Sequence, residues 1–352
     1  MVKGYAGYFA LLITFGWSVG CKTSSQPVSS NTTVVDTVGR FQNPLLLSGP
    51  DPWVILKDGW YYYTHTTGRN LQLFKTRAMS RLRQADSKVV WTPPATGPNS
   101  RNIWAPELHF VNGKWYLYYA ADDGRNENHR MWVLENASAD PLQGEWIDRG
   151  KLNLPDDRWA IDATLLQHQG QLYTVWSGWE GFTDGRQDLY IAKMTNPWTS
   201  EGPRIRLSTP EYNWEKEGSP DVNEGPEFLL NGNKIFLVYS ASHCSTDNYA
   251  LGMLTANATA DLMNPASWRK SPQPVFGPYA GGGTNGVGHN SFFTTPDGKG
   301  HWILYHANPL PDLGCSNRRS PRMQRFTFKP DGTPDFGEPV KLDQWLPRPS
   351  GE

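Results

Sequence analysis

Apolar and polar residues alternate along most of this chain in short runs, and glycine-containing turns separate the runs. Five segments share one arrangement, in which an apolar strand is followed by a turn with a glycine and then by a second strand dense in aromatic and β-branched residues. The turns and second strands read DGWYYYTH, NGKWYLYYA, QGQLYTVWS, NGNKIFLVYS and GKGHWILYH. Their glycines are Gly59, Gly113, Gly170, Gly232 and Gly300. Two strands joined by a short turn predict a β-hairpin.

These hairpins recur at similar intervals, which indicates a repeat architecture. About 40 residues follow each hairpin, enough for two further strands such as LYIAKM and ALGMLT. Long helical periodicity is absent and proline is frequent, so helices are disfavoured. The pattern predicts an all-β fold, a five-bladed β-propeller with units from Asp51 to about Tyr305. A β-sandwich with accidentally similar hairpins is the alternative. A further strand in RMQRFTFKPDGTPDFG would complete the last blade or the first.

The first residues form a separate, apolar segment. Lys3 precedes an apolar run over residues 5–17 that matches the hydrophobic region of a signal peptide and is short for a membrane span. Small residues then lead to Cys21, as in a bacterial lipoprotein signal, in which the cysteine is lipidated. Ordinary signal cleavage is the alternative, because Ser18 replaces the usual leucine. We therefore expect export, with the protein either lipid-anchored in the cell envelope or secreted or periplasmic. The expected division of the chain is a signal peptide over 1–21, a flexible tether over 22–40 and the propeller over 41–347.

Charge and cysteine content narrow the partners and the compartment. The formal net charge is −1 and the pI is near neutral, which gives no indication of nucleic acid or of an anionic membrane surface as a partner. Contact with a membrane is expected only through a lipid on Cys21. Two cysteines remain, Cys244 and Cys315, and in an oxidising compartment such a pair predicts one disulfide. Two buried thiols are the alternative.

Chemistry is expected where the innermost strand of each blade begins, because these ends converge on one mouth of the central channel. Counting back eight residues from the turn glycine gives the same register position in four units. The fifth unit has a longer turn, and a histidine is its candidate. The five positions are Asp51, Ala105, Asp162, Glu224 and His289.

Three acidic residues at five equivalent positions are costly for folding, because converging carboxylates repel each other and their burial is unfavourable. Such an arrangement is typical of an active site with tuned pKa values. Glycoside hydrolysis needs one carboxylic acid that protonates the leaving oxygen and one carboxylate that activates water or attacks the sugar. A third can orient the acid and raise its pKa. Asp51, Asp162 and Glu224 are therefore the candidate catalytic residues, and a separation of about 6.5–9.5 Å across the channel would favour inversion.

Short segments spread over all five units carry a family resemblance. They are GPDPWV (49–54), IWAPELHF (103–110), IDATLL (161–166), NEGPEFL (223–229), YSASHCSTDNYALGML (239–254), GHNSFF (288–293), YHANP (305–309) and CSNRRSPRMQRFTF (315–328). In this order the set resembles glycoside hydrolase family 43, and in particular its exo-acting α-L-arabinofuranosidases. The resemblance covers the chain from about Asn43 to Leu342.

The resemblance implies a role for each acid. Asp51, in the DP motif, matches the general base, Glu224, in the EGP motif, matches the general acid, and Asp162, in the DAT motif, matches the carboxylate that orients the acid and raises its pKa. It also implies inversion at the anomeric carbon and release of terminal α-L-arabinofuranose from arabinose-containing plant polysaccharides or oligosaccharides. No cofactor is required in this family, although a structural calcium near the channel axis is a further expectation.

Three tryptophans are candidates for contacts with the sugar. Trp53 shares the inward parity of Asp51 on its strand. Trp104 immediately precedes a channel position and would form a wall of the pocket. Trp179 lies in a loop after a strand, where it would stack on a sugar. Packing explains each of them at least as well.

A histidine and an arginine complete the candidate substrate site. His289 would lie near the axis, beside a water or a calcium ion as in the family, or it is a hydrogen-bonded histidine of the propeller core. Arg322 is expected to hold a hydroxyl or the acid's carboxylate, as a fifth-blade arginine does in the family. The competing arginines are Arg318, Arg319 and Arg325.

Other activities stay open from sequence. The same fold and mechanism on another sugar would give a β-xylosidase, a galactofuranosidase or an endo-arabinanase, because substrate choice depends on loops at the mouth. A fructosidase-like enzyme would carry a Trp-Met-Asn-Asp-Pro segment, which this sequence lacks. A non-catalytic glycan-binding propeller has little reason to retain three converging acids.

Overall fold

The computed structural model describes residues 1, 38–183, 185–279 and 281–352. Nearly all of the expected signal peptide, with Cys21, and most of the expected tether lie outside these residues. In the part of the chain that the structure describes, no helix is long and apolar enough to cross a membrane.

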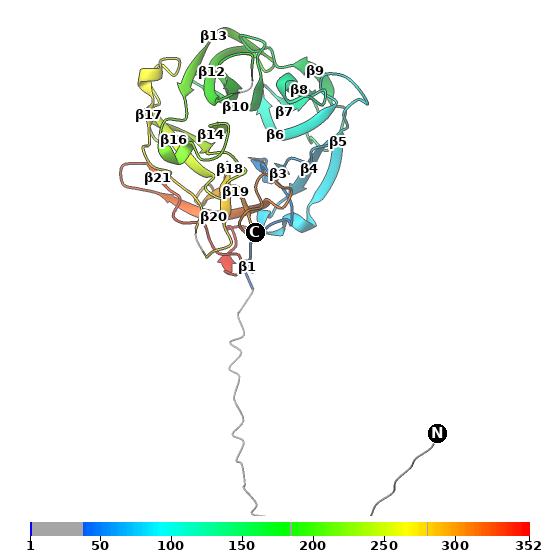
Figure 1. Cartoon of the computed structure of the whole chain (residues 1–352), viewed down its shortest axis with the longest axis vertical. Coiled ribbons are helices and arrows are strands. Elements are labelled where there is room, and N and C mark those ends of the chain that lie inside the picture. The colour runs from blue at the N-terminus through cyan, green and yellow to red at the C-terminus, as the bar shows by residue number, and fades with distance from the viewer. Residues whose placement is uncertain (2–37, 184, 280) are drawn as a thin grey trace, which may run out of the picture. The chain divides into compact units, whose positions relative to one another are not determined.

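Five antiparallel four-stranded sheets surround a common axis, as Figure 1 shows. The first blade holds β2 (Trp53–Lys57), β3 (Trp60–Thr64), β4 (Leu71–Thr76) and β5 (Asp86–Trp91). The second holds β6 (Arg101–Val111), β7 (Lys114–Asp122), β8 (Arg130–Asn136) and β9 (Ile147–Lys151). The third holds β10 (Ala160–His168), β11 (Gln171–Trp179), β12 (Gln187–Asn196) and β13 (Thr199–Ser208). The fourth holds β14 (Asn223–Asn231), β15 (Lys234–Ala241), β16 (Ala250–Asn257) and β17 (Arg269–Lys270), and the fifth holds β18 (Asn285–Thr294), β19 (His301–Asn308), β20 (Ser320–Phe328) and β21 (Pro334–Asp335). The predicted five-bladed propeller is confirmed.

Short elements occupy the connections and the chain ends. Two strands pair with each other outside the blades, β1 (Arg40–Phe41) and β22 (Leu346–Pro347). Among the described residues, four 3-10 helices lie between strands: η1 (Met79–Gln84), η2 (Asn126–Asn128), η3 (Asn213–Glu215) and η4 (Pro265–Ser267).

The aromatic second strands form the walls between neighbouring blades. In β7, Trp115 and Tyr119 pack with residues of the first blade, while Tyr116 and Tyr118 pack with residues of the third. Successive side chains of a strand point to opposite faces, and here both faces meet another sheet. The density of large apolar residues in these strands therefore follows from burial on two sides rather than from sugar binding.

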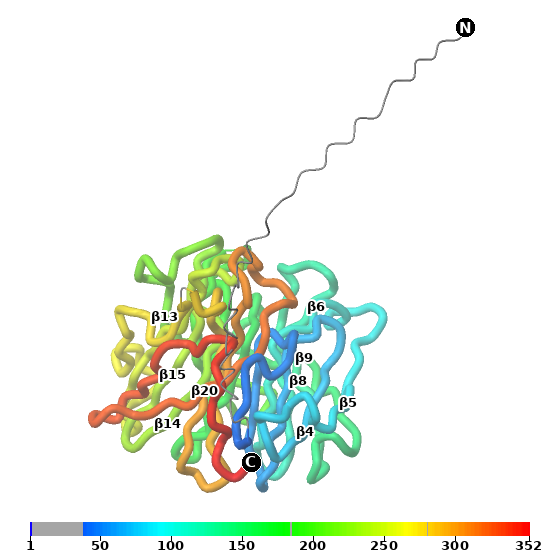
Figure 2. Tube along the Cα trace, turned by 90° about the horizontal axis from the view of Figure 1, so that it is seen from below, coloured from blue at the N-terminus to red at the C-terminus, as the bar shows by residue number. Residues whose placement is uncertain are grey.

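The two ends of the described domain close the ring, and they lie side by side in Figure 2. The side chain of Asn43 donates to the carbonyl of Met323 and accepts from its amide, both at 3.0 Å. The strand foreseen in the tail is β20, which completes the last blade together with β21. Glu352 packs against the first blade, where its side-chain carboxylate accepts the backbone amides of Met79 and Ser80 at the start of η1.

A left-handed residue stands near the start of each inner strand, and its position corrects the predicted register. Asp51, Ala105, Asp162 and His289 have φ between 42° and 55°, but in the fourth blade the left-handed residue is Gly225, with φ 53°. Gly59, Gly113 and Gly170 are second in their two-residue turns, whereas Gly232 is first, between Asn231 and Lys234. Counting back from the glycine therefore ends one residue early in this blade, at Glu224.

Tyr239 packs closely against Gly252 in the fourth blade, so a substitution of this glycine tests the packing there. A Cβ on Gly252 would lie 2.3 Å from Cζ of Tyr239, which is fully buried. We expect Gly252→Ala to lower the free energy of unfolding by about 1–3 kcal/mol, because the overpacked ring has no room to move. Guanidinium denaturation followed by tryptophan fluorescence measures this. Gly181→Ala is the control, since no atom lies within 4 Å of its added methyl group. Equal midpoints for both variants would contradict the packing argument.

Candidate active site

One cavity at the starts of the inner strands collects the three predicted acids. Asp51, Asp162 and Glu224 all line this cavity, whose volume is about 440 Å³. Asp51 and Asp162 are themselves left-handed residues, a conformation that costs a non-glycine residue about 1–2 kcal/mol. Glu224 instead precedes the left-handed Gly225, whose amide donates to Oδ2 of Asp162 at 3.0 Å. The fold thus joins the acid of the third blade directly to the backbone of the fourth.

Asp51 is surrounded by groups that stabilise its ionised form. Nη1 of Arg319 donates to Oδ1 at 3.1 Å, and the hydroxyl of Thr66 donates to Oδ2 at 2.6 Å. Burial alone would raise the pKa of Asp51, but Arg319, His289, His306 and Thr66 together hold that pKa well below its usual range. Arg319 is the dominant cation. Nδ1 of His306 accepts the amide hydrogen of Asp51 at 3.0 Å and so carries no proton of its own.

The pKa values of Glu224 and Asp162 are shifted in the opposite direction, upward. Burial raises the pKa of Glu224 to about 7, helped by the charge of Asp51 and opposed by the Tyr249 hydroxyl, which donates to Oε1 at 2.9 Å. Burial and the neighbouring charges of Glu224 and Asp51 raise the pKa of Asp162 well above its usual range. Near neutral pH the cavity therefore presents one ionised carboxylate and a pair of carboxyl groups that retains a proton.

Tryptophan side chains form part of the cavity wall. Trp104 and Trp179 both line it, and Trp179 is the last residue of β11 rather than part of the loop that follows. The ring of Trp104 stacks on His129 with centroids 4.0 Å apart, and Trp179 stacks on Trp159 at 4.9 Å with an interplanar angle of 3°. Trp159 also lines the cavity and was not singled out from sequence. Its position just ahead of IDATLL, like that of Trp104 ahead of Ala105, is the signal that would have identified it.

Two predicted substrate contacts are corrected by the structure. Trp53 does not line this cavity. Its Nε1 donates to the carbonyl of Leu108, and its ring packs on His109. Although Trp53 has the same parity as Asp51, it lies two residues further along the chain and lines a different pocket. Arg322 is fully buried, and its guanidinium donates to the carbonyls of Gly283 and Ala307.

The arginine that reaches the acids is Arg319, one of the competing choices. It lies in the loop between β19 and β20, one residue before the strand begins. Arg322 lies within β20, where its side chain packs into the fifth blade. Chain position alone does not separate the two, since both stand in the same basic stretch, NRRSPRMQR.

His289 lines the cavity, and its Nδ1 is 3.5 Å from Oδ1 of Asp51. The side chains around it do not fit a calcium ion, which takes about 6–8 oxygen ligands. The nearby Asp51 carboxylate is already paired with Arg319 and Thr66, and the neighbouring His306 offers only nitrogen. We assign no step to a metal at this position.

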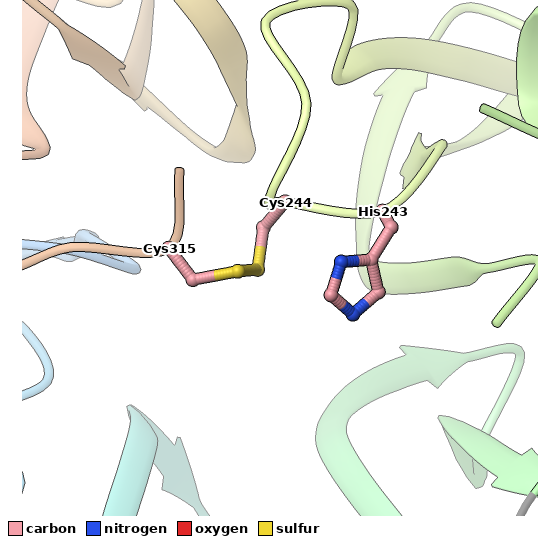
Figure 3. Close-up of side chains that lie close together, drawn as sticks. All are labelled: His243, Cys244 and Cys315. Carbon is pink, nitrogen blue, oxygen red and sulfur yellow. A yellow bond between two sulfur atoms is a disulfide. The ribbon is translucent and has the colours of Figure 1, made fainter. Parts of the chain in front are cut away.

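The predicted disulfide joins two loops at the cavity rim. Cys244 and Cys315 are bonded, with sulfur atoms 2.02 Å apart, and both line the cavity together with His243. Figure 3 shows the ring of His243 beside this bond. Within the described residues, these three are the only His, Cys, Asp and Glu side chains grouped closely enough to hold a metal ion, and their sulfur atoms are already committed to the disulfide.

Comparisons with known proteins show which family the chain belongs to. Residues 41–334 match the family described as glycosyl hydrolases family 43. An extracellular exo-α-(1→5)-L-arabinofuranosidase of Streptomyces avermitilis is 42% identical over 310 residues, which are 85% of this chain and 64% of that protein. The chain thus spans slightly less than two thirds of that relative. Alpha-L-arabinofuranosidase 43 of Humicola insolens is 38% identical over 342 residues, covering 94% of this chain and 68% of that protein.

A solved structure extends the likeness to three dimensions. The crystal structure of an α-L-arabinofuranosidase from Lactobacillus brevis superposes with a TM-score of 0.82 at 36% identity, covering 86% of this chain and 98% of that one. The family match spans both the blades and all three cavity acids. This chain belongs to family 43 of the glycosyl hydrolases.

Proposed function

We propose that this protein is an inverting, exo-acting α-L-arabinofuranosidase that releases terminal arabinofuranose from arabinose-containing oligosaccharides or polysaccharides. The observation that carries the proposal is the opposite bias of two acids in one cavity. The pKa of Asp51 is held low by Arg319, while burial raises that of Glu224 to about 7. The names of the two relatives and of the solved structure support arabinofuranose as the sugar.

The two acids perform the two proton transfers of a single displacement. Ionised Asp51 accepts a proton from a water molecule, whose oxygen attacks the anomeric carbon. Protonated Glu224 donates its proton to the glycosidic oxygen, so that the bond from the anomeric carbon to this oxygen breaks as the new bond forms. Attack on the face opposite the leaving group inverts the anomeric configuration.

Asp162 acts on the acid rather than on the sugar. The charge of Glu224 raises the pKa of Asp162, and since this repulsion is mutual, the two carboxyl groups together retain a proton. Oδ2 of Asp162 also accepts from the amide of Gly225, the residue next to that acid. Asp162 thereby helps to keep Glu224 protonated and in place between turnovers. No cofactor takes part in this scheme.

Exo action is supported by the rim of the cavity and by the relatives. The disulfide-linked loops and the tryptophan wall enclose a space within the size range of small-ligand sites, which is about 300–1,000 Å³. A pocket of this kind accepts a chain end, whereas an endo-acting enzyme needs an open groove. Such chain ends occur on plant polysaccharides, which lie outside the bacterial cell. We therefore propose that the protein is exported and anchored through a lipid on Cys21.

The leaving group separates the roles of the two acids. Glu224→Gln should lower turnover of natural arabinosides by about 10²–10⁴-fold and turnover of activated aryl arabinofuranosides much less, because a good leaving group needs no proton. Asp51→Asn should abolish turnover of both, since water then lacks its base. Initial rates on both substrate types measure this. Glu227→Gln is the matched control, because Glu227 lies on the same strand but lines a different pocket. Equal losses on both substrates for Glu224→Gln would overturn the acid's role.

The pH profile reports the environment of Glu224. Activity should fall as pH rises through the pKa of Glu224, about 7, because the acid must be protonated. Tyr249→Phe removes a hydrogen bond that stabilises the carboxylate, so the basic limb of kcat/KM should move to higher pH, by less than about one unit. Tyr305→Phe, which removes a buried hydroxyl bonded to Gln324 in the fifth blade, should leave the limb in place. A limb that moves to lower pH in Tyr249→Phe contradicts the assignment.

The stereochemistry of the product tests the single displacement. The first sugar that appears from an α-L-arabinofuranoside should be the β-anomer. Proton NMR at early times, before the anomers equilibrate, distinguishes the two. Initial release of the α-anomer would indicate a covalent intermediate and exclude Asp51 as a base acting on water in the first step.

A further inference from the structure

Two loops meet over one side of the cavity, and they come from different blades. The first joins β15 to β16 and contains Cys244, and the second joins β19 to β20 and contains Cys315. Besides the disulfide, the amide of Asp312 donates to both carboxylate oxygens of Asp247 at 3.1 Å. A methyl group on Gly314 would lie 3.4 Å from the backbone of Ser245, so the loops are also in close contact there.

The fourth-blade loop provides a firm base. Ser242 of this loop makes two hydrogen bonds: its amide donates to the carbonyl of Glu215, and its hydroxyl donates to the carbonyl of Trp214. The amide of His243 donates to the carbonyl of Glu217 at 2.8 Å. Cys244 therefore follows a segment that is bonded to η3 and the residues after it.

The fifth-blade loop carries Arg319 and is the more exposed of the two. Cys315 and Arg318 are exposed, whereas Cys244 is half-buried. The guanidinium of Arg319 is held by this loop itself: Nε donates to the carbonyl of Ser316 at 3.1 Å and Nη2 to that of Cys315 at 3.4 Å. Its remaining nitrogen, Nη1, donates to Asp51. The backbone that orients the guanidinium is thus the backbone that the disulfide fixes.

We infer that the Cys244–Cys315 disulfide is a positioning device, which holds Arg319 against Asp51 by tying the exposed loop to the fourth blade. This inference rests on the proposed role of Asp51 as the base. When the bond is absent, the two carbonyls that orient Arg319 move with their loop, and the guanidinium separates from the carboxylate. The cavity remains, but its cation no longer has a defined place.

The ionisation of Asp51 then changes in a defined direction. Arg319 is the cation beside it, and the other titratable groups that act on it or respond to it are His65, His289, His306, Tyr63, Tyr249, Asp162 and Glu224. Among these described groups, Arg319 alone is permanently charged as a cation, and two of the others, Asp162 and Glu224, are acids. Without Arg319, burial is opposed only by His289, His306 and Thr66, so the pKa of Asp51 rises and ionised base is lost at a higher pH than before.

The test compares the oxidised and reduced forms of the full-length protein. Reduction with a thiol reagent, confirmed by a gain of two titratable thiols, should move the acidic limb of kcat/KM to higher pH by about one unit or more. At a pH on that limb kcat/KM should fall about tenfold, with little change near pH 6. Cys244→Ser combined with Cys315→Ser should reproduce the shift. If this variant does not fold, the reduced natural protein still decides the question.

Two arginine variants separate positioning from other roles of the disulfide. Arg319→Gln should move the acidic limb by a similar amount, and reduction should then add no further shift, because the two changes act through one contact. Arg318→Gln, next to it in the exposed loop, should keep both the limb and its response to reduction. An unmoved limb after complete reduction overturns the inference. So does a rise in KM without a shift, which would make the disulfide only a wall of the pocket.

A titration without substrate keeps this inference distinct from the proposed function. The carboxyl-carbon NMR signal of Asp51, assigned with Asp51→Asn, should titrate at higher pH in the reduced protein than in the oxidised one. This shift is expected even if the enzyme proves inactive on arabinosides, an outcome that would overturn the proposed function alone. Identical titrations in both forms would overturn the positioning role whatever the substrate.

Discussion

The contact between Arg319 and Asp51 is the interaction on which the chemistry of the cavity depends. Three carboxyl groups buried at one channel mouth cannot all be ionised at low cost, and without a cation each would tend to keep its proton. A guanidinium 3.1 Å from one oxygen of Asp51 selects which of the three loses it. The resulting charge then contributes to the raised pKa of both Glu224 and Asp162. One ion pair thereby distinguishes chemically similar residues as the proposed base and the proposed acid.

The five blades repeat one backbone arrangement, and in the fourth blade the acid is shifted by one residue relative to it. A left-handed residue stands near the start of each inner strand, and in four of the five blades it carries a side chain. Two blades place an aspartate there and accept the conformational cost, while the second blade has only Ala105 and leaves space. In the fourth blade a glycine takes this position, so its acid stands one residue earlier and is reached by Tyr249 rather than by Arg319. The difference in local backbone accounts for the difference in environment between the acid and the base.

Features that repeat along the chain could be predicted from sequence, and features that depend on single tertiary contacts could not. Alternation and turn glycines were enough for the blades and for the convergence of Asp51, Asp162 and Glu224. The register of the fourth blade was missed because Gly232 occupies the other place in its turn. Trp53 and Arg322 were assigned to the sugar from parity and motif, but the direction of β2 and the packing of β20 place them elsewhere. Arg319 was one of four candidate arginines, and only the position of its loop in space distinguishes it from Arg322. Trp159 was missed although its place just ahead of IDATLL resembles that of Trp104 ahead of Ala105.

The strand pair that closes the ring lies far from the entrance to the cavity. β1 pairs with β22, and Leu346 and Pro347 of β22 lie with Thr295 and Gly300, beyond the end of β18 that is remote from His289 and the cavity. The strand pair that closes the ring therefore lies at the end of the propeller opposite the acids. A branched polymer that approaches the mouth meets the rim loops and not this pair, so substrate entry and ring closure use separate surfaces of the domain.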